Sequence, residues 1–214
     1  MTGIEVVSFD MECTLIDDSY SSLIWETDIP RLYGEKHGLD MEEARARVLV
    51  EYDKVGEDRP EWYDIDYWFK RLGLDDDWRE LLRKREGACC VYSEVPRVLE
   101  RMSGEYTLIV SSNTIREFLE VQLKKLPDVF TKVYSAPSDL KTVKKTDSFY
   151  GKICKEMDVN PSSMAHVGDS LKFDYEEPRK LGIRSFYLDR QGRSSGEHVV
   201  CDLDEFEEKL RFFR

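Results

Sequence analysis

Polar residues that could bind a metal ion or a phosphoryl group occur in four short groups, each beyond the end of an expected strand. They are Asp10, Glu12 and Thr14; Ser112 and Asn113; Lys144 and Lys145; and Asp169 and Asp174. Carboxylate oxygens are ligands that suit Mg²⁺, while hydroxyl, amide and ammonium groups neutralise phosphoryl oxygens. The carboxylate of Asp10 could also attack phosphorus as a nucleophile. These residue types favour Mg²⁺-dependent phosphoryl chemistry if the fold brings them together.

The elements that must position these groups are short apolar strands alternating with helices. Strands are expected at residues 4–9, 106–111, 133–135, 164–167, 184–188 and 198–200, and helices at 94–102, 114–125, 146–157, 174–181 and 203–213. Such alternation predicts an α/β fold, a Rossmann-like parallel sheet with helices on both faces. Ligands of these sheets bind at the carboxyl ends of the strands. The four polar groups should therefore meet at one edge of the sheet.

Residues 18–87 have a different character, because Glu, Arg, Tyr and Trp recur there at helical spacing. Breaks at Gly38, residues 56–60 and Gly73 indicate about four amphipathic helices. We therefore expect an α/β core made of residues 1–17 and 88–214, and an all-α cap domain inserted at 18–87. The cap is rich in aromatic residues, namely Trp25, Trp62, Tyr63, Tyr67, Trp68 and Phe69. Most of them should form the core of a helical bundle, and one or two should face the active site and select the substrate.

Composition excludes several classes of protein. The 214 residues are 41% hydrophobic and 36% charged, which is typical of a soluble globular chain, and the net charge is −12. That charge argues against binding nucleic acid non-specifically or docking on anionic membranes. The five cysteines form no CxxC pair, so no disulfide framework and no zinc site are expected. Without an apparent leader or membrane-spanning run, the expected location is cytoplasmic, as a monomer or a homodimer.

Three further interpretations concern residues outside the four groups. His166 falls inside an expected strand and is interpreted as a packed core histidine, and Arg190 as a surface or salt-bridge residue. The residues from Thr114 to Glu117 have the pattern of a capping box that opens a helix.

The order of the four groups resembles that of the haloacid dehalogenase-like hydrolase superfamily, over nearly the whole chain. Asp10, Thr14 and the apolar Leu15 match its first motif, DxDxT, and Ser112 with Asn113 matches its second. The helical segment between these motifs is typical of one branch of the superfamily, in which the cap is inserted there.

The third and fourth motifs follow in the same order. Gly168-Asp169-Ser170 with Asp174 matches the fourth motif. The usual spacing from the third-motif lysine to Asp169 selects Lys144. Lys145, which stands where the family usually has proline, remains the alternative.

The resemblance implies a role for each of these residues. Asp10 would be the nucleophile that forms an aspartyl-phosphate, and Glu12 the acid and base that serves the leaving group and the water. Mg²⁺ would be held by Asp10, the backbone carbonyl of Glu12, Asp169 and Asp174. The phosphate of the substrate, a small phosphorylated metabolite, would be bound by Ser112, Asn113 and Lys144.

Glu12 is the one clear departure from the family pattern, because phosphatases of the family normally have aspartate there. The extra methylene would move the acid by about 1 Å, a displacement that can matter greatly for rate. Three alternatives stand beside the phosphatase. One is a 2-haloacid dehalogenase, which needs no metal but normally lacks an acid at this position, and another is a sugar-phosphate mutase, which shares the cap type. The third, which the replacement by Glu12 favours, is a catalytically weak relative kept for binding or regulation.

Overall fold

A single parallel sheet forms the centre of the molecule in the computed structural model, which describes residues 3–212. The strands are arranged in the order β3-β2-β1-β4-β5-β6. Their bounds are Val6–Phe9 for β1, Thr107–Ser112 for β2, Phe130–Ser135 for β3, Met164–Gly168 for β4, Arg184–Leu188 for β5 and Val199–Val200 for β6. This order is that of a Rossmann-like fold. The predicted fold class is confirmed.

The register of the central strands determines which residues meet at the carboxyl edge. Phe9, the last residue of β1, pairs with Val110 on one side and Val167 on the other. The residues that follow, among them Asp10, Ser112 and Asp169, therefore emerge at nearly the same height. β1 lies between β2 and β4, where the strand order changes direction, and crevices at such positions bind ligands.

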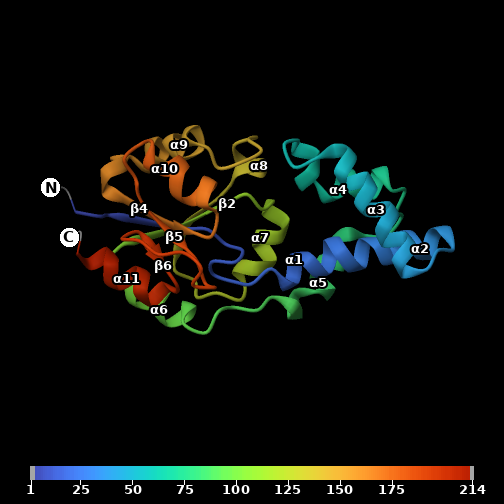
Figure 1. Cartoon of the computed structure of the whole chain (residues 1–214), viewed down its shortest axis with the longest axis horizontal. Helices are drawn as coiled ribbons and strands as arrows, with labels where there is room; N and C mark the ends of the chain where they lie inside the picture. The colour runs from blue at the N-terminus through green and yellow to red at the C-terminus, as the bar shows by residue number, and fades with distance from the viewer. Residues whose placement is uncertain (1–2, 213–214) are drawn as a thin grey trace.

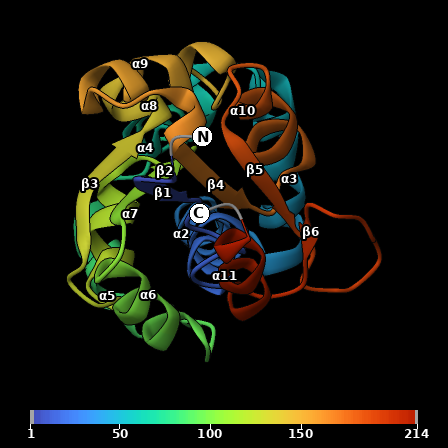
Figure 2. The ribbon, with the colours of Figure 1, turned by 90° about the vertical axis from the view of Figure 1, so that its left-hand side faces the viewer.

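The two faces of the sheet are covered by different helices, as Figure 2 shows end-on. Side chains of alternating residues point to opposite faces of a strand. In β1, Val7 and Phe9 thus join the apolar cluster that contains residues of α6 (Val95–Ser103) and α11 (Leu203–Arg211). Val6 belongs to the cluster on the other face, with residues of α9 (Asp147–Met157). The short helix α10 (Glu177–Arg179) also packs near α9.

The chain between β1 and α6 is helical, and within this fully described stretch no strand longer than an isolated bridge occurs. Its elements are α1 (Ser19–Ser22), η1 (Leu23–Asp28), α2 (Ile29–His37), α3 (Met41–Val55), η2 (Pro60–Tyr63), α4 (Ile65–Arg71), α5 (Trp78–Lys84) and η3 (Glu86–Ala88). We call residues 19–88 the helical insert. Most of it lies beyond the sheet and its covering helices (Figure 1). Its apolar cluster includes Phe118 and Val121 of α7 (Arg116–Leu123), so α7 forms the contact with the core.

The two connections to the helical insert lie side by side. The Asp17 backbone N–H donates to Cys90 O at 2.9 Å, and the Tyr92 N–H donates to Leu15 O at 3.2 Å. The chain therefore leaves and re-enters the core through one paired hinge.

Within residues 3–212, no helix is both long enough and apolar enough to cross a lipid bilayer.

Two helix starts differ from the sequence expectations. The expected capping box is not formed, because α7 begins at Arg116 with Ile115 at its N-cap and no side-chain cap. The Thr114 N–H is instead bonded to Ser112 Oγ. The helix expected at 174–181 starts earlier as a π-helix, η5 (Leu171–Glu176), and continues only as the short α10. π-Helices are rare and often occur at functional sites.

Two short elements remain, one at each edge of the sheet. They are α8 (Ala136–Asp139), directly after β3, and η4 (Pro161–Ser163), directly before β4.

Candidate active site

Asp10 lies at the carboxyl end of β1 and is only 7% exposed. Its backbone N–H donates to Val167 O at 3.0 Å, which continues the pairing of β1 with β4 by one residue. The chain then turns sharply, with Cys13 at a φ of +57°, in the left-handed region. Thr14 returns its hydroxyl to within 3.5 Å of Asp10 Oδ2. The turn therefore keeps the carboxylate at the carboxyl edge of the sheet, close to Asp169 and Asp174.

Arg190, in the loop after β5, holds this turn. Its guanidinium donates to Cys13 O at 3.2 Å and to Thr14 O at 2.6 Å. It also pairs with Glu94 at 2.8 Å and lies over the ring of Tyr92, 3.5 Å from its centroid. From the sequence, Arg190 was expected to be only a surface or salt-bridge residue. No local sequence signal identifies it, because every partner is distant along the chain.

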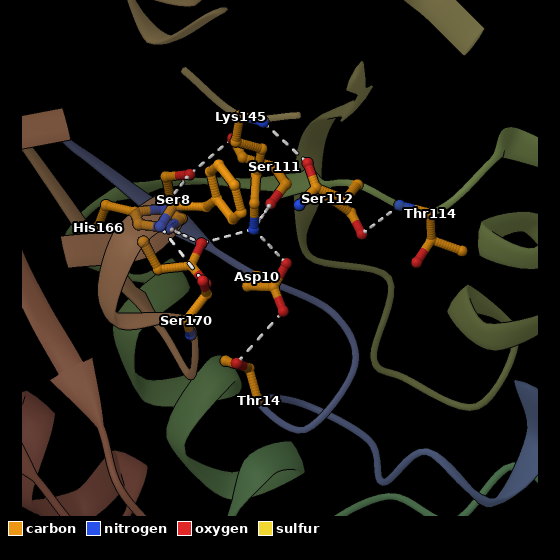
Figure 3. A network of polar contacts seen from close by, with 12 residues as sticks. Ser8, Asp10, Thr14, Ser111, Ser112, Thr114, Lys145, His166 and Ser170 are labelled. Atoms are coloured by element: carbon orange, nitrogen blue, oxygen red, sulfur yellow. Dashed lines mark hydrogen bonds and ion pairs between the residues drawn. The ribbon is translucent and has the colours of Figure 1, made fainter. Parts of the chain in front are cut away.

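Lys145 is the lysine that enters the site, as Figure 3 shows. Its Nζ donates to Asp10 Oδ1, to Asp174 Oδ1 at 2.5 Å and to Ser111 O at 3.1 Å. The ammonium group is almost completely buried. Asn113 Oδ1 accepts the backbone N–H of Lys145 at 2.9 Å, so Asn113 positions the lysine loop.

The residue selected by spacing, Lys144, points elsewhere. Its Nζ lies 3.2 Å from Glu57 Oε2 and 3.6 Å from Asp58 Oδ1, both in the helical insert. The selection of Lys144 therefore does not agree with the geometry, which favours the alternative, Lys145. The loop between α8 and α9 contains a left-handed residue, Lys141, at a φ of +52°.

Three carboxylates converge beside Lys145. One oxygen each of Asp10, Asp169 and Asp174 lies within 4.8 Å of the others. Gly168 makes this approach possible, because a Cβ there would lie 2.4 Å from Asp174 Cγ and 2.8 Å from Asp10 Cβ. Asp174 belongs to η5, and its Oδ2 accepts a hydrogen bond from the Ser170 backbone N–H at 3.0 Å.

The electrostatics of this cluster differ from one carboxylate to the next. Burial alone would raise the pKa of Asp174, but Lys145 and His166 lower it below its usual range. Burial raises the pKa of Asp10, and Asp174 and Asp169 raise it further, against the opposing charge of Lys145. Asp169 is reached by solvent, yet partial desolvation and then the charge of Asp174 raise its pKa to about 6. Crowded carboxylates of this kind repel one another unless a cation joins them.

A polar layer beneath the site supports Asp174 and Lys145. His166 Nε2 lies 2.8 Å from Asp174 Oδ1, and His166 Nδ1 lies 2.9 Å from Ser8 Oγ. Ser8 Oγ donates in turn to Ser111 Oγ at 2.8 Å, and the hydroxyl of Tyr150 lies 3.0 Å from His166 Nε2. His166 is fully buried as predicted, and burial lowers its pKa. Its ring contacts Asp174, one of the three converging carboxylates, so it does more than fill apolar space.

Ser112 ends β2 beside Asp10 and is 1% exposed. Its Oγ accepts the Thr114 N–H at 3.1 Å. An accepted bond leaves the hydroxyl hydrogen available to a ligand oxygen. The structure thus brings Asp10, Ser112, Asp169 and Asp174 to one edge of the sheet, as expected. The Asn113 side chain instead binds the backbone of the lysine loop.

Glu12 faces a different side of the site from the carboxylate cluster. It lines a cavity of about 490 Å³ between the core and the helical insert. Gln122 Nε2 of α7 donates to Glu12 Oε1 at 2.6 Å. Burial raises the pKa of Glu12, while the hydrogen bond from Gln122 and the nearby Ser21 hydroxyl lower it. A carboxyl with a raised pKa is suited to donate a proton near neutral pH. Gln122, buried within α7, is a second residue that the sequence analysis missed.

The donor set fits Mg²⁺. The converging groups of Asp10, Asp169 and Asp174 are all carboxylate oxygens, the hard ligands that this ion prefers. Their mutual repulsion, seen in the raised pKa values of Asp10 and Asp169, is what a divalent cation would relieve. The side chain of Glu12 lies outside this group, which is consistent with the expectation that only its backbone carbonyl would contact a metal.

Comparison with known sequences identifies relatives of the chain. A sequence model of the haloacid dehalogenase-like hydrolases matches residues 4–182. The GMP/IMP nucleotidase YrfG of Escherichia coli strain K12 is 33% identical over 72 residues, as is its counterpart from Shigella flexneri. That match covers 34% of this chain and 32% of the nucleotidase, so it extends over about a third of either protein.

Solved structures share the whole fold. A haloacid dehalogenase-superfamily phosphatase from Thermococcus onnurineus superposes with a TM-score of 0.83 at 24% identity, covering 97% of this chain and 98% of that one. A 2-haloacid dehalogenase from Pseudomonas syringae gives 0.71 at 21% identity, covering 99% and 100%. A magnesium-bound hydrolase, YfnB of Bacillus subtilis, gives 0.69 at 15% identity, covering 98% and 100%. At these identities the likeness concerns the fold alone.

Proposed function

We propose that this chain, which belongs to the haloacid dehalogenase-like hydrolases, is a Mg²⁺-dependent phosphatase that acts through an aspartyl-phosphate at Asp10. The substrate is a small phosphorylated metabolite. The observation that carries the proposal is the convergence on Asp10 of a buried ammonium group, Lys145, and of two further carboxylates, Asp169 and Asp174. This combination suits phosphoryl transfer, because both the nucleophile and the transferred group are anionic and need positive charge beside them.

In the first step an oxygen of Asp10 attacks phosphorus while the bond to the leaving oxygen breaks. Glu12 donates its proton to that oxygen, which departs as an alcohol. Lys145 and the Ser112 hydroxyl stabilise the charge on the phosphoryl oxygens. Mg²⁺, when bound by Asp10, Asp169 and Asp174, supplies positive charge that offsets the repulsion between nucleophile and phosphoryl group.

In the second step water attacks phosphorus of the aspartyl-phosphate. Glu12, now ionised, accepts a proton from the water, the bond between Asp10 and phosphorus breaks, and inorganic phosphate leaves. Asp10 regains its carboxylate and Glu12 its proton, so the cycle closes. Lys145 takes the role that spacing gave to Lys144.

The nucleotidase relative supports phosphate-ester hydrolysis over the alternatives. Its name describes hydrolysis of GMP and IMP, which are phosphate monoesters, and the similarity to this chain is a sequence similarity, unlike the likeness to the dehalogenase fold. Nucleoside monophosphates are accordingly candidate substrates.

The decisive assay is hydrolysis of p-nitrophenyl phosphate by the purified protein with Mg²⁺, after EDTA, and with Ca²⁺ in its place. We expect activity that needs Mg²⁺ and that Ca²⁺ inhibits, because calcium's larger and looser coordination shell misplaces the nucleophile. Asp10→Asn, which preserves shape but removes the charge, should abolish turnover while the protein stays folded. Full activity after EDTA would exclude the proposal.

Halide release from 2-chloropropionate in EDTA would identify a dehalogenase instead. Failure of both assays, with intact Mg²⁺ binding, would favour the binding or regulatory relative.

A further inference from the structure

The cavity beside Glu12 is built mainly from aromatic residues of the helical insert and α7. Those that line it are Trp25, Tyr52, Trp62, Tyr63, Trp68 and Phe118. A volume of about 490 Å³ is within the range of small-molecule sites. Because Glu12 and Asn113 also line it, the cavity opens beside the residues that follow Asp10 and Ser112.

The aromatic groups are held in a fixed arrangement. Tyr52 is in the middle, and its ring makes edge contacts with Trp25, Trp62 and Trp68 at centroid distances of 6.1, 6.0 and 4.6 Å. The Trp25 ring stacks on Phe118 of α7, 5.7 Å away and with planes 6° apart.

The polar atoms of the buried rings are used within the protein. The Tyr52 hydroxyl donates to Trp25 O, and Trp68 Nε1 donates to Trp62 O. What the two rings can offer a ligand is therefore mainly apolar surface. Trp25, Trp62 and Tyr63 are only partly buried, so their rings are accessible.

The charged lining residues are all acidic. They are Glu12, Glu26 and Asp53, and no Lys, Arg or His is among the described residues that line the cavity. Arg45 compensates Glu26 at 2.6 Å, whereas Glu12 is bonded to the neutral amide of Gln122. An anionic group entering here would lose its hydration and gain no cation.

From these observations we propose that this cavity binds the leaving group of the substrate, and that this group carries an uncharged planar ring and no second anionic group. The inference rests on the proposed phosphatase activity and specifies its substrate class. Bisphosphates and phosphate monoesters whose leaving group carries a free carboxylate are then poor substrates, while nucleoside monophosphates and other esters that carry an aromatic ring are good ones.

Three phosphate esters with closely related leaving groups test this inference on the parent protein. They are benzyl phosphate, 4-carboxybenzyl phosphate, which adds one negative charge, and cyclohexylmethyl phosphate, which keeps the size but loses the planar ring. We expect kcat/KM for benzyl phosphate to exceed that for cyclohexylmethyl phosphate by about threefold to tenfold, from stacking. It should exceed that for the carboxylated ester by at least about tenfold, from unpaired charge.

Variants then locate the effect. Trp62→Ala should bring the ratio of benzyl to cyclohexylmethyl ester close to one, mainly through KM, and Trp62→Phe should restore most of it. Tyr33→Ala is the matched control, since Tyr33 is a half-buried aromatic residue of the same insert that lies outside the cavity lining. It should leave the ratio unchanged. Because the readout is a ratio on one protein sample, a partly unfolded preparation does not distort it.

Equal kcat/KM values for the three esters, or a preference for the carboxylated one, would overturn the inference and leave the phosphatase proposal standing. Hydrolysis of all three no faster than by Asp10→Asn would overturn the phosphatase proposal itself.

Discussion

At the scale of single residues, Glu12 is the departure from the family pattern that the structure explains. Its longer side chain reaches Gln122 Nε2 at 2.6 Å. Glu12 is thus held from α7. An aspartate in its place would fall short of Gln122 by about one methylene.

Replacing Glu12 with alanine tests its role as acid and base. Turnover of an alkyl phosphate should fall by roughly 10²–10⁴-fold, the usual contribution of such a group. In kcat/KM, which reports the phosphorylation step, the loss should be much smaller for p-nitrophenyl phosphate, because its leaving oxygen needs little protonation. Glu12→Asp should also lose activity on alkyl phosphates, because the shorter acid is no longer held. Equal activity of Glu12→Ala and the parent on both esters across a pH series would show that position 12 transfers no proton.

Asp169 gives a prediction for the pH dependence of metal binding. Its pKa is raised to about 6, so below that pH it carries a proton that must leave before Mg²⁺ binds. Mg²⁺ affinity should therefore be about tenfold weaker at about pH 5 than at about pH 7. The raised pKa of Asp10 acts in the same direction.

Calorimetry in two buffers of different ionisation enthalpy measures this effect and counts the protons released. Asp169→Asn should bind Mg²⁺ weakly at both pH values. Asp76→Asn, a change at an exposed carboxylate far along the chain from the site, should behave like the parent. An affinity that does not change with pH in the parent would contradict the assignment of Asp169 as a ligand.

At the scale of elements, the turn after β1 depends on a residue from the loop after β5. Cys13 adopts a left-handed conformation that costs a non-glycine residue free energy, and Arg190 donates to Cys13 O and Thr14 O. The guanidinium also bridges to Glu94, next to the returning connection of the insert. We regard Arg190 as a positioning residue for Asp10.

Replacing Arg190 with lysine keeps the charge but removes the paired donors. The turn should then shift, and kcat should fall by about 10- to 100-fold with little change in KM, as misplacement by about 1 Å does. The thermal midpoint should change little. Arg97→Lys, at an exposed ion pair with Asp204, is the matched control. A rise in KM with unchanged kcat, or equal effects of the two variants, would show that Arg190 does not position Asp10.

The elements also show what the sequence could and could not predict. β1 and β4 were predictable together with their polar ends, because each is a short, mostly apolar run that Asp10 or Asp169 follows directly. Lys145 was not separable from Lys144, since the loop around the left-handed Lys141 has no periodicity. Arg190 and Gln122 were missed because their partners lie far away along the chain. The capping box failed because Ser112 Oγ takes the Thr114 N–H.

At the scale of the whole molecule, the helical insert meets the core at a paired hinge and through α7. Phe118 and Val121 of α7 belong to the apolar cluster of the insert and are nearly inaccessible to solvent. Lys144 adds ion pairs to Glu57 and Asp58, although these acids are exposed and such pairs contribute little stability. The helical insert is therefore attached to the core mainly through the paired hinge and the apolar contact with α7.

Deleting residues 19–88 tests whether the insert is a separable cap. The connections lie side by side, so a short flexible linker can join Asp18 to Cys89. With Phe118→Ser and Val121→Ser to remove the exposed apolar surface, we expect a soluble domain with one cooperative unfolding transition. It should hydrolyse benzyl and cyclohexylmethyl phosphate at similar rates, because the aromatic cavity is gone. Failure of this core to fold, while the full-length chain with the same two serines does fold, would show that the insert is part of one domain.

The central claim is that Asp10 becomes phosphorylated during turnover. Acid quenching of the protein within milliseconds of mixing with Mg²⁺ and p-nitrophenyl phosphate, followed by peptide mass spectrometry, measures this directly. We expect a transient phosphoryl group on the peptide that contains Asp10, formed as fast as the burst of p-nitrophenol and absent from Asp10→Asn. A burst without phosphorylation of that peptide, or phosphorylation at another residue that persists in Asp10→Asn, would contradict it.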